Sequence, residues 1–121
     1  MKVMIVDDSP TVRRLIKSVL EKEGVEIVEC TDGKEAIESF SIHWPDLVLM
    51  DLEMKHVDGF EATRQIKAKF PDAQIVILTS FSDENMKAAA LASGANAYLL
   101  KDDMEQLRAL VKPPLDGNQA Q

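Results

Sequence analysis

The sequence predicts an α/β domain built on a doubly wound, five-stranded parallel sheet with five helices. Five short apolar runs recur along the 121 residues, at 3–6, 26–30, 47–50, 75–78 and 97–100. The segments between these runs carry helical periodicity and helix-capping residues. Strict alternation of strands and helices favours parallel strands, because each helix returns the chain to the end of the sheet where the previous strand began.

The first helix is the clearest of the five. Its apolar residues recur with a helical period and share one face: Val12, Leu15, Ile16, Val19 and Leu20. Ser9 followed by Pro10 is typical of a helix start, and Gly24 indicates the end.

Capping residues predict where the later helices begin and end. Acidic pairs with capping-box spacing mark the second and third helices: Asp32 with Glu35, and Asp58 with Glu61. Ser82, followed by two acidic residues, predicts the start of the fourth helix, and Gly94 predicts its end. The fifth helix is expected from about residue 103 to 111, before Pro113 and Pro114.

The polarity of the strands predicts their order in the sheet. The run 26–30 alternates polar and apolar residues, which places it at an edge, whereas the other four runs are apolar nearly throughout, as in central parallel strands. With strand two at an edge beside strand one, right-handed crossovers lead to the order 2-1-3-4-5. The winding direction then reverses between strands one and three, where such sheets bind ligands at the carboxyl ends of their strands.

Polar residues follow four of the predicted strands directly. Asp7 and Asp8 follow strand one, Asp51 follows strand three, Thr79 strand four and Lys101 strand five. Because the carboxyl ends of parallel strands share one rim, these side chains should converge. Three carboxylates in one crevice suit a hard divalent cation, Mg²⁺ or Mn²⁺. One such cation and one lysine would balance their charge.

Asp51 is expected at the centre of this crevice. A carboxylate can attack phosphorus and carry an acyl phosphate. Phosphoryl transfer depends on positioning and on neutralising charge, which the cation and Lys101 would supply. The Thr79 hydroxyl could donate a hydrogen bond to a phosphoryl oxygen.

Together, the stretches IVDDSP, LMDLEM with DGFE, ILTSFSD and YLLKD resemble the receiver domain of two-component response regulators, which has a flavodoxin-like topology. The resemblance covers residues 2 to about 111. It implies a phosphorylation-activated switch in which a histidine kinase or a small acyl phosphate phosphorylates Asp51. It also implies that Asp7, Asp8, Asp51 and the backbone carbonyl of Glu53 bind the metal, and that Thr79 and Lys101 bind the phosphoryl group.

The resemblance further implies how the signal is relayed and how long it lasts. Tyr98 would change rotamer as Thr79 moves toward the phosphoryl group, and an output domain or protein would respond at the face formed by helix four, strand five and helix five. A phosphorylation-dependent homodimer could be a further partner. Glu53 and Phe81 occupy the positions that flank the attacking water in receivers, so these two side chains would tune the phosphoryl lifetime.

Two positions depart from the pattern of the family. Lys55 stands where the family often has proline, so the loop after strand three is expected to be less stiff. Asp102 follows Lys101 where proline is also common, which argues against a cis peptide bond there.

Three alternative functions have to be weighed against a phosphorylated receiver. A flavodoxin-like electron carrier would bind the FMN phosphate after strand one, where Asp7 and Asp8 would repel it. A phosphatase of the haloacid dehalogenase type needs a second aspartate two residues after the first, and here that residue is Ser9. A non-phosphorylated pseudo-receiver would be only an interaction module, which the presence of all five site residues disfavours. We therefore expect a regulator that assists only its own phosphorylation and dephosphorylation, not an enzyme.

Composition and charge narrow the partners and the location. A net charge of -7 argues against direct binding of nucleic acid, which requires a basic surface. No apolar stretch is long enough to span a bilayer, and no signal-peptide pattern is present. The single Cys30 cannot form an internal disulfide and fits a reducing compartment. The expectation is a cytoplasmic receiver domain at residues 1–112, with residues 113–121 as a flexible tail or linker.

Overall fold

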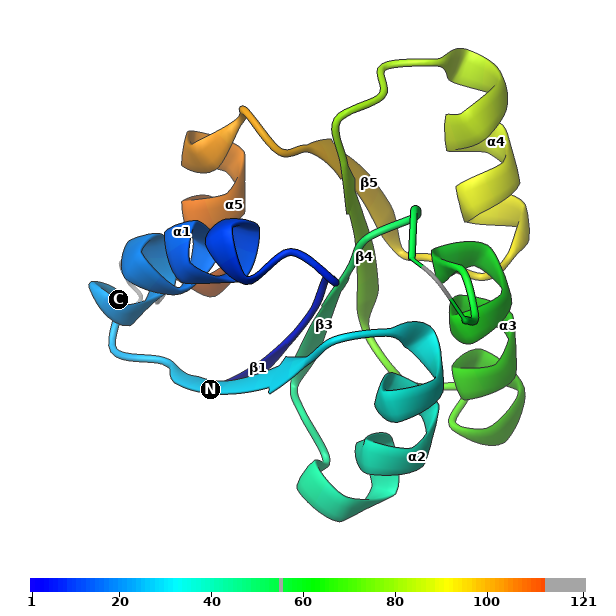
Figure 1. Ribbon diagram of the computed structural model, residues 1–121, viewed down its shortest axis with the longest axis horizontal. Helices are drawn as coiled ribbons and strands as arrows, with labels where there is room; N and C mark the ends of the chain where they lie inside the picture. The colour runs from blue at the N-terminus through cyan, green and yellow to red at the C-terminus, as the bar shows by residue number, and fades with distance from the viewer. Residues whose placement is uncertain (55, 113–121) are drawn as a thin grey trace, which may run out of the picture.

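Five parallel strands form one sheet in the order β2-β1-β3-β4-β5, as predicted (Figure 1). The strands are β1 (Lys2–Val6), β2 (Glu26–Cys30), β3 (Leu47–Met50), β4 (Ile75–Thr79) and β5 (Ala97–Leu100). The computed structural model describes residues 1–54 and 56–112. The expectations for Lys55 and for the segment 113–121 lie outside the described residues and stay predictions.

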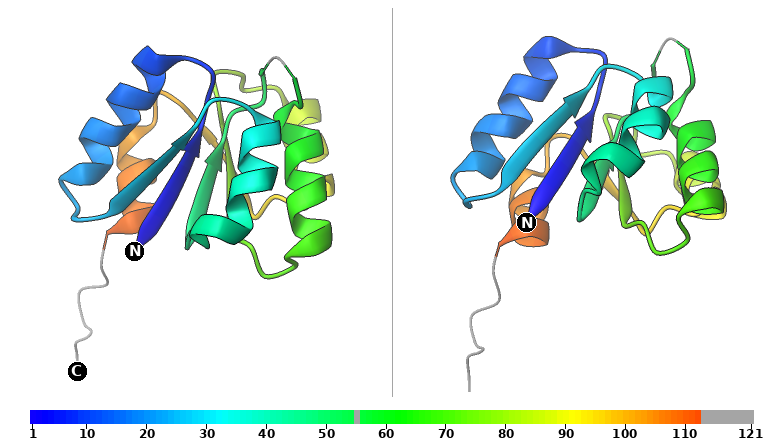
Figure 2. Two further views of the ribbon diagram at one scale, coloured as in Figure 1. Left: turned by 60° about the horizontal axis from the view of Figure 1, so that its bottom comes forward. Right: turned by 90° about the horizontal axis from the view of Figure 1, so that it is seen from below.

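Helices cover both faces of the sheet (Figures 1 and 2). They are α1 (Pro10–Glu21), α2 (Gly33–His43), α3 (Gly59–Lys69), α4 (Glu84–Ala92) and α5 (Met104–Val111). Helices α1 and α5 lie on one face, and α2, α3 and α4 lie on the other. Each central strand contributes side chains to the core on both faces of the sheet, because successive side chains point to opposite faces. In β1, Val3 and Ile5 pack toward α1 and α5, whereas Met4 and Val6 pack on the other side.

The two edge strands of the sheet differ in sequence and in burial. Strand β2 is at one edge, as predicted, with Glu26 and Glu29 exposed, Ile27 and Val28 half-buried and Cys30 buried. Strand β5 is the other edge, and all four of its residues are partly exposed. The predicted strand order places this run at an edge, which the structure confirms, although its residues are as apolar as those of a central strand. The strand has a neighbour on one side only, and many of the side chains of α4 beside it are small.

Side-chain caps begin the helices close to the predicted positions. The Ser9 hydroxyl, Asp32 and Asp58 accept hydrogen bonds from backbone N–H groups two or three residues into α1, α2 and α3. For α4 the prediction of Ser82 was wrong, because Asp83 is the cap and accepts from the N–H of Asn85 at 2.7 Å. A carboxylate at this position also interacts favourably with the positive end of the helix dipole.

Two other sequence expectations concern the backbone and the membrane. No cis peptide bond occurs in the described part of the chain, in agreement with Asp102 after Lys101. Within the same residues, none of the helices combines the length and the hydropathy that crossing a bilayer requires.

Candidate functional site

Three aspartates meet at the carboxyl ends of β1 and β3. The two strands are neighbours, and the backbone pairing continues past them, since the Asp51 N–H donates to the Val6 carbonyl at 2.9 Å. One carboxylate oxygen from each of Asp7, Asp8 and Asp51 lies within 4.8 Å of the others. Asp7 and Asp51 are 2% and 7% exposed, whereas Asp8 is open to solvent. The predicted acidic crevice is therefore present, with one carboxylate at its mouth.

Lys101 reaches into the same crevice from the end of β5. Its Nζ lies 2.9 Å from Asp7 Oδ2 and 3.1 Å from Asp51 Oδ1, and its backbone N–H donates to the Thr79 carbonyl at 2.8 Å. Burial alone would lower the pKa of Lys101, but its contacts with Asp7 and the charge of Asp51 outweigh burial and raise that pKa. The ammonium group is thus held in its charged form between two carboxylates.

The ammonium group of Lys101 does not fully balance the acidic cluster. Burial, and then the charge of Asp7, raises the pKa of Asp51 to about 6, although Lys101 acts in the opposite direction. Apart from the ion pair with Lys101, the buried Asp7 Oδ2 has no hydrogen-bond partner among the described residues. Three carboxylates with one ammonium group among them supply hard oxygen ligands and excess negative charge, which fit a small divalent cation.

Thr79 and Tyr98 are connected through the backbone of Phe81. Thr79 is almost fully buried at the end of β4, and its Oγ1 accepts a hydrogen bond from the Phe81 N–H at 3.3 Å. The Tyr98 hydroxyl donates to the Phe81 carbonyl. Burial, followed by the charges of Asp83 and Glu84, raises the pKa of Tyr98. The sequence indicates Thr79 and Tyr98 as a pair, but it does not reveal the backbone N–H and carbonyl of Phe81 between them.

Glu53 and Phe81, expected to flank the attacking water, are both exposed. Glu53 follows β3 and shares with Asp8 an open hollow of about 520 Å³ that Met54, Phe60 and Met86 also line. The side chain of Phe81 is 40% exposed. The site is thus accessible from solvent beside Asp8.

The sequence profile of the response regulator receiver domain matches residues 3–112. The chain belongs to this family. The recognition from sequence is confirmed, and so are the fold and the place of the protein in two-component signalling. Receiver domains are signalling regulators, not enzymes in the usual sense, and they act as phosphorylation-activated switches.

Individual relatives agree with this assignment. The receiver domain is 41% identical to the uncharacterized transcriptional regulatory protein YhcZ of Bacillus subtilis over 84% of this chain and 49% of YhcZ. It is 36% identical to the chemotaxis protein CheY of the same species over 83% of this chain and 84% of CheY. The chain thus spans about half the length of the transcriptional regulators that it matches, but most of the length of CheY.

Solved structures show the same fold. A two-component response regulator of the LuxR family from Aurantimonas sp. SI85-9A1 superposes with a TM-score of 0.83 and 31% identity. The match covers 91% of this receiver domain and 84% of that chain.

Sequence reasoning missed the groups that hold Asp7 in place. The Ser9 N–H donates to Asp7 Oδ1 at 2.9 Å, and the Arg13 guanidinium donates to the Asp7 carbonyl at 2.6 Å. Arg13 also pairs with Glu29 at 3.0 Å and so connects α1 to β2. The signal in the sequence is only an arginine one turn into α1, and its partner is not predictable without the fold.

Gly59, in the DGFE stretch of the receiver domain, permits a close backbone approach to the site. A Cβ atom at this position would lie 2.1 Å from the carbonyl oxygen of Asp51, so any side chain would displace the end of β3. The sequence shows the glycine but not what it contacts.

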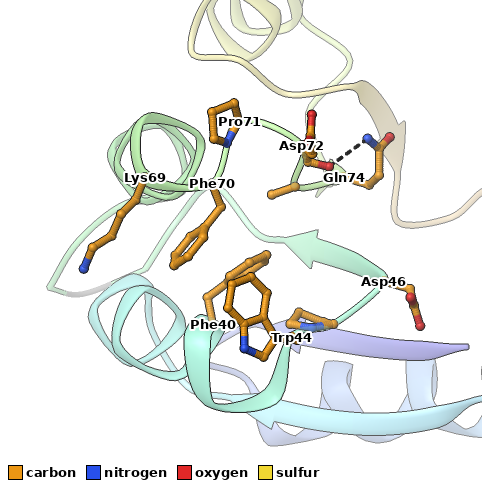
Figure 3. Close-up of a pocket in the computed structure, with 10 residues that line it drawn as sticks. Phe40, Trp44, Asp46, Lys69, Phe70, Pro71, Asp72 and Gln74 are labelled. Atoms are coloured by element: carbon orange, nitrogen blue, oxygen red, sulfur yellow. Dashed lines mark hydrogen bonds between the residues drawn. The ribbon is translucent and has the colours of Figure 1, made fainter.

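A second cavity, of about 420 Å³, lies at the opposite end of the sheet (Figure 3). It is lined by packed aromatic rings, with Phe40 stacked on Phe70 at 4.7 Å and Trp44 edge-on to Phe70 at 5.1 Å. Trp44 ends α2 with a φ of 48° and is 60% exposed. Residues 45–46 and 73–74 of this cavity precede β3 and β4, so it lies at the amino ends of those strands, away from the acidic cluster.

Proposed function

We propose that this receiver domain accepts a phosphoryl group on Asp51 from a histidine kinase or a small acyl phosphate. An Oδ atom of Asp51 attacks phosphorus, and the bond from phosphorus to the donor nitrogen or oxygen breaks, with its electron pair leaving on the donor. The product is an acyl phosphate on Asp51. The observation that supports this most is the position of Asp51, buried between Asp7 and Lys101 at the switch point of the sheet.

The groups around Asp51 have separate roles in the proposal. Asp7, Asp8, Asp51 and the backbone carbonyl of Glu53 would hold Mg²⁺, or Mn²⁺ in its place. The bound cation would supply positive charge for the phosphoryl oxygens. Lys101, 3.1 Å from Asp51 Oδ1, would pair with another phosphoryl oxygen, and the Thr79 hydroxyl would donate to a third.

The partners follow from the same proposal. The histidine kinase supplies the phosphoryl group, and an output domain or protein responds at the face of α4, β5 and α5. A phosphorylation-dependent homodimer is a further option. We place the receiver domain at residues 1–112 in the cytoplasm, with residues 113–121 as a tail or linker and no direct contact with nucleic acid or membrane.

Intact mass spectrometry tests the proposal. Incubation with acetyl phosphate and Mg²⁺ should add one phosphoryl group per chain, and the absence of any adduct would favour a pseudo-receiver.

Phosphorylation should change amide exchange far from Asp51. Once a phosphoryl oxygen draws the Thr79 hydroxyl inward, the hydrogen bond from the Phe81 N–H breaks, and the Tyr98 hydroxyl loses its fixed acceptor. Exchange measured with and without phosphorylation should therefore differ along residues 82–111. In Thr79→Ala the domain should still be phosphorylated but should lose these distant changes. Changes confined to the surroundings of Asp51 in the wild type would contradict the relay.

Phe81 should prolong the phosphorylated state. Its ring offers no hydrogen bond to an attacking water and some bulk to exclude one, whereas the negative charge of Glu53 is poorly placed beside a phosphoryl dianion. The backbone of Phe81 carries the contact with Tyr98, so replacing the side chain leaves that acceptor in place. Decay of the adduct should be about tenfold faster in Phe81→Ala and Phe81→Glu, which corresponds to about 1.4 kcal/mol of barrier.

The matched control for this experiment is Leu91→Ala, which also removes an exposed apolar side chain but lies on α4. Equal decay in the wild type and both Phe81 variants would mean that the ring has no part in the lifetime.

A further inference from the structure

The loop between β3 and α3 carries Glu53, and its inner end is fixed beside Asp51. The Gly59 N–H donates to the Leu52 carbonyl at 3.1 Å. Gly59 itself is in direct contact with the backbone of Asp51, where a Cβ atom would not fit. The residue just before Glu53 is therefore held against the first turn of α3.

The outer end of this loop contacts the start of α2 at two points. A Cβ atom on Gly33 would lie 2.4 Å from the Val57 carbonyl oxygen, so the helix and the loop touch backbone to backbone. Beside this contact, Asp32 Oδ2 lies 2.9 Å from His56 Nδ1. The other oxygen of Asp32 accepts the Glu35 N–H at 2.8 Å and caps α2.

Asp32 thus holds its own helix with one oxygen and the loop with the other. The Glu35 N–H, and then the His56 ring, hold the pKa of Asp32 below its ordinary value, which keeps this carboxylate charged. The described residues of the loop, 53–54 and 56–58, include no proline, so no ring restricts their backbone. The backbone at Glu53 lies between an inner and an outer contact, and both contacts fix the loop. The pair of Asp32 and His56 is the side-chain part of the outer contact.

We propose that Asp32 and His56 are positioning residues, whose pairing keeps the carbonyl of Glu53 directed toward Asp7, Asp8 and Asp51 and thereby raises the affinity for Mg²⁺. This inference rests on the proposed metal site. Groups that orient a metal ligand without touching the metal commonly change affinity by tenfold or more. The His56 side chain is 71% exposed, so the expected effect is smaller, at about threefold to tenfold.

The direction in which each substitution changes the affinity for Mg²⁺ distinguishes a positioning role from a purely electrostatic one. Removing the negative charge of Asp32 would weaken the binding of a cation from a distance, whereas replacing His56 removes no negative charge and would strengthen binding or leave it unchanged. Positioning instead predicts that the loss of either partner weakens binding, because either loss frees the loop.

The experiment measures the Mg²⁺ dissociation constant by calorimetry in four variants. Asp32→Ser keeps a capping oxygen for α2 but cannot also reach His56. His56→Ala removes the partner, and His56→Asn restores a donor close to the position of Nδ1. Asp58→Ser is the matched control, since Asp58 caps α3 at the end of the same loop through a bond to the Glu61 N–H.

The expected result is an increase of about threefold to tenfold in the dissociation constant for Asp32→Ser and for His56→Ala. His56→Asn should bind nearly as the wild type does. Without metal, amide exchange of Glu53, Met54 and Val57 should rise in His56→Ala and return toward the wild-type rate in His56→Asn. Asp58→Ser should change the dissociation constant less than Asp32→Ser.

Several results would overturn the inference. Opposite effects in Asp32→Ser and His56→Ala would show long-range charge alone, and equal effects in Asp32→Ser and Asp58→Ser would show a general charge loss. Faster exchange with an unchanged dissociation constant would mean that the pair shapes the loop but not the metal site. If Mg²⁺ binds and requires Asp8 while the Asp32 and His56 variants bind normally, the inference fails and the proposed function stands. If the wild type binds no Mg²⁺, both fail.

Discussion

Replacing Asp51 with asparagine should abolish the phosphoryl adduct. Asparagine has the same shape, but its amide is far less nucleophilic than a carboxylate and carries no charge for the cation or for Lys101. The neighbouring acids are poor substitutes. Asp7 is engaged by the Ser9 N–H and by Lys101, and Asp8 lies at the solvent-exposed mouth. Intact mass spectrometry with acetyl phosphate and Mg²⁺ should show one adduct in the wild type and none in Asp51→Asn.

Two controls make the loss of the adduct specific. Asp72→Asn removes an exposed carboxylate at the opposite end of the molecule and should leave the adduct unchanged. Chelation of divalent cations in the wild type should remove the adduct without any substitution. An adduct of undiminished yield in Asp51→Asn would refute Asp51 as the single acceptor.

Loss of the adduct in Asp51→Asn should not come from unfolding. The raised pKa of Asp51 means that burial and the charge of Asp7 destabilise its ionised form when no metal is bound. Removing that charge relieves the repulsion. In the presence of a chelator, Asp51→Asn should therefore melt at the same temperature as the wild type or above it.

The site residues at the ends of the strands were predictable from sequence, because parallel strands place their carboxyl ends at one edge of the sheet. Once residues 3–6 and 47–50 are recognised as neighbouring parallel strands, the next residues, Asp7 and Asp51, have to share a rim. The order of the strands was predictable as well, since the polar residues within its apolar run place β2 at an edge. For β5 the edge position follows from the strand order alone, because apolar composition does not say how many neighbours a strand has.

The contacts that support the site could not be predicted in this way. Arg13 binds a backbone carbonyl, Thr79 and Tyr98 contact the backbone N–H and the carbonyl of Phe81, and His56 reaches the cap of another helix. Each contact joins segments far apart in the sequence or passes through main-chain atoms that leave no residue pattern. A carboxylate at a strand end is a chemical signal, whereas the group that orients it depends on how the helices pack.

Mg²⁺ should stabilise the folded receiver domain through its acidic cluster. Binding that is specific to the folded state adds about 2.7 kcal/mol at a free Mg²⁺ concentration one hundred times the dissociation constant. For a domain of this size, that corresponds to a rise in Tm of about 10 °C. The rise has a structural reason, because three carboxylates face one ammonium group, and that ammonium group is the only partner of the buried Asp7 Oδ2 among the residues that the structure describes.

Asp8→Asn should remove most of this stabilisation. Asp8 is exposed, so the substitution takes away one carboxylate ligand without disturbing packing or the contacts of Asp7 with Ser9 and Lys101. Without metal, the variant should be as stable as the wild type or more stable, because one of three crowded negative charges is gone. Thermal melts with Mg²⁺ and with a chelator, on the wild type, Asp8→Asn and the distant Asp72→Asn, measure both effects. An equal rise in Tm with Mg²⁺ in the wild type and Asp8→Asn would mean that the cation binds elsewhere, and the assignment of Asp8 as a ligand would have to be abandoned.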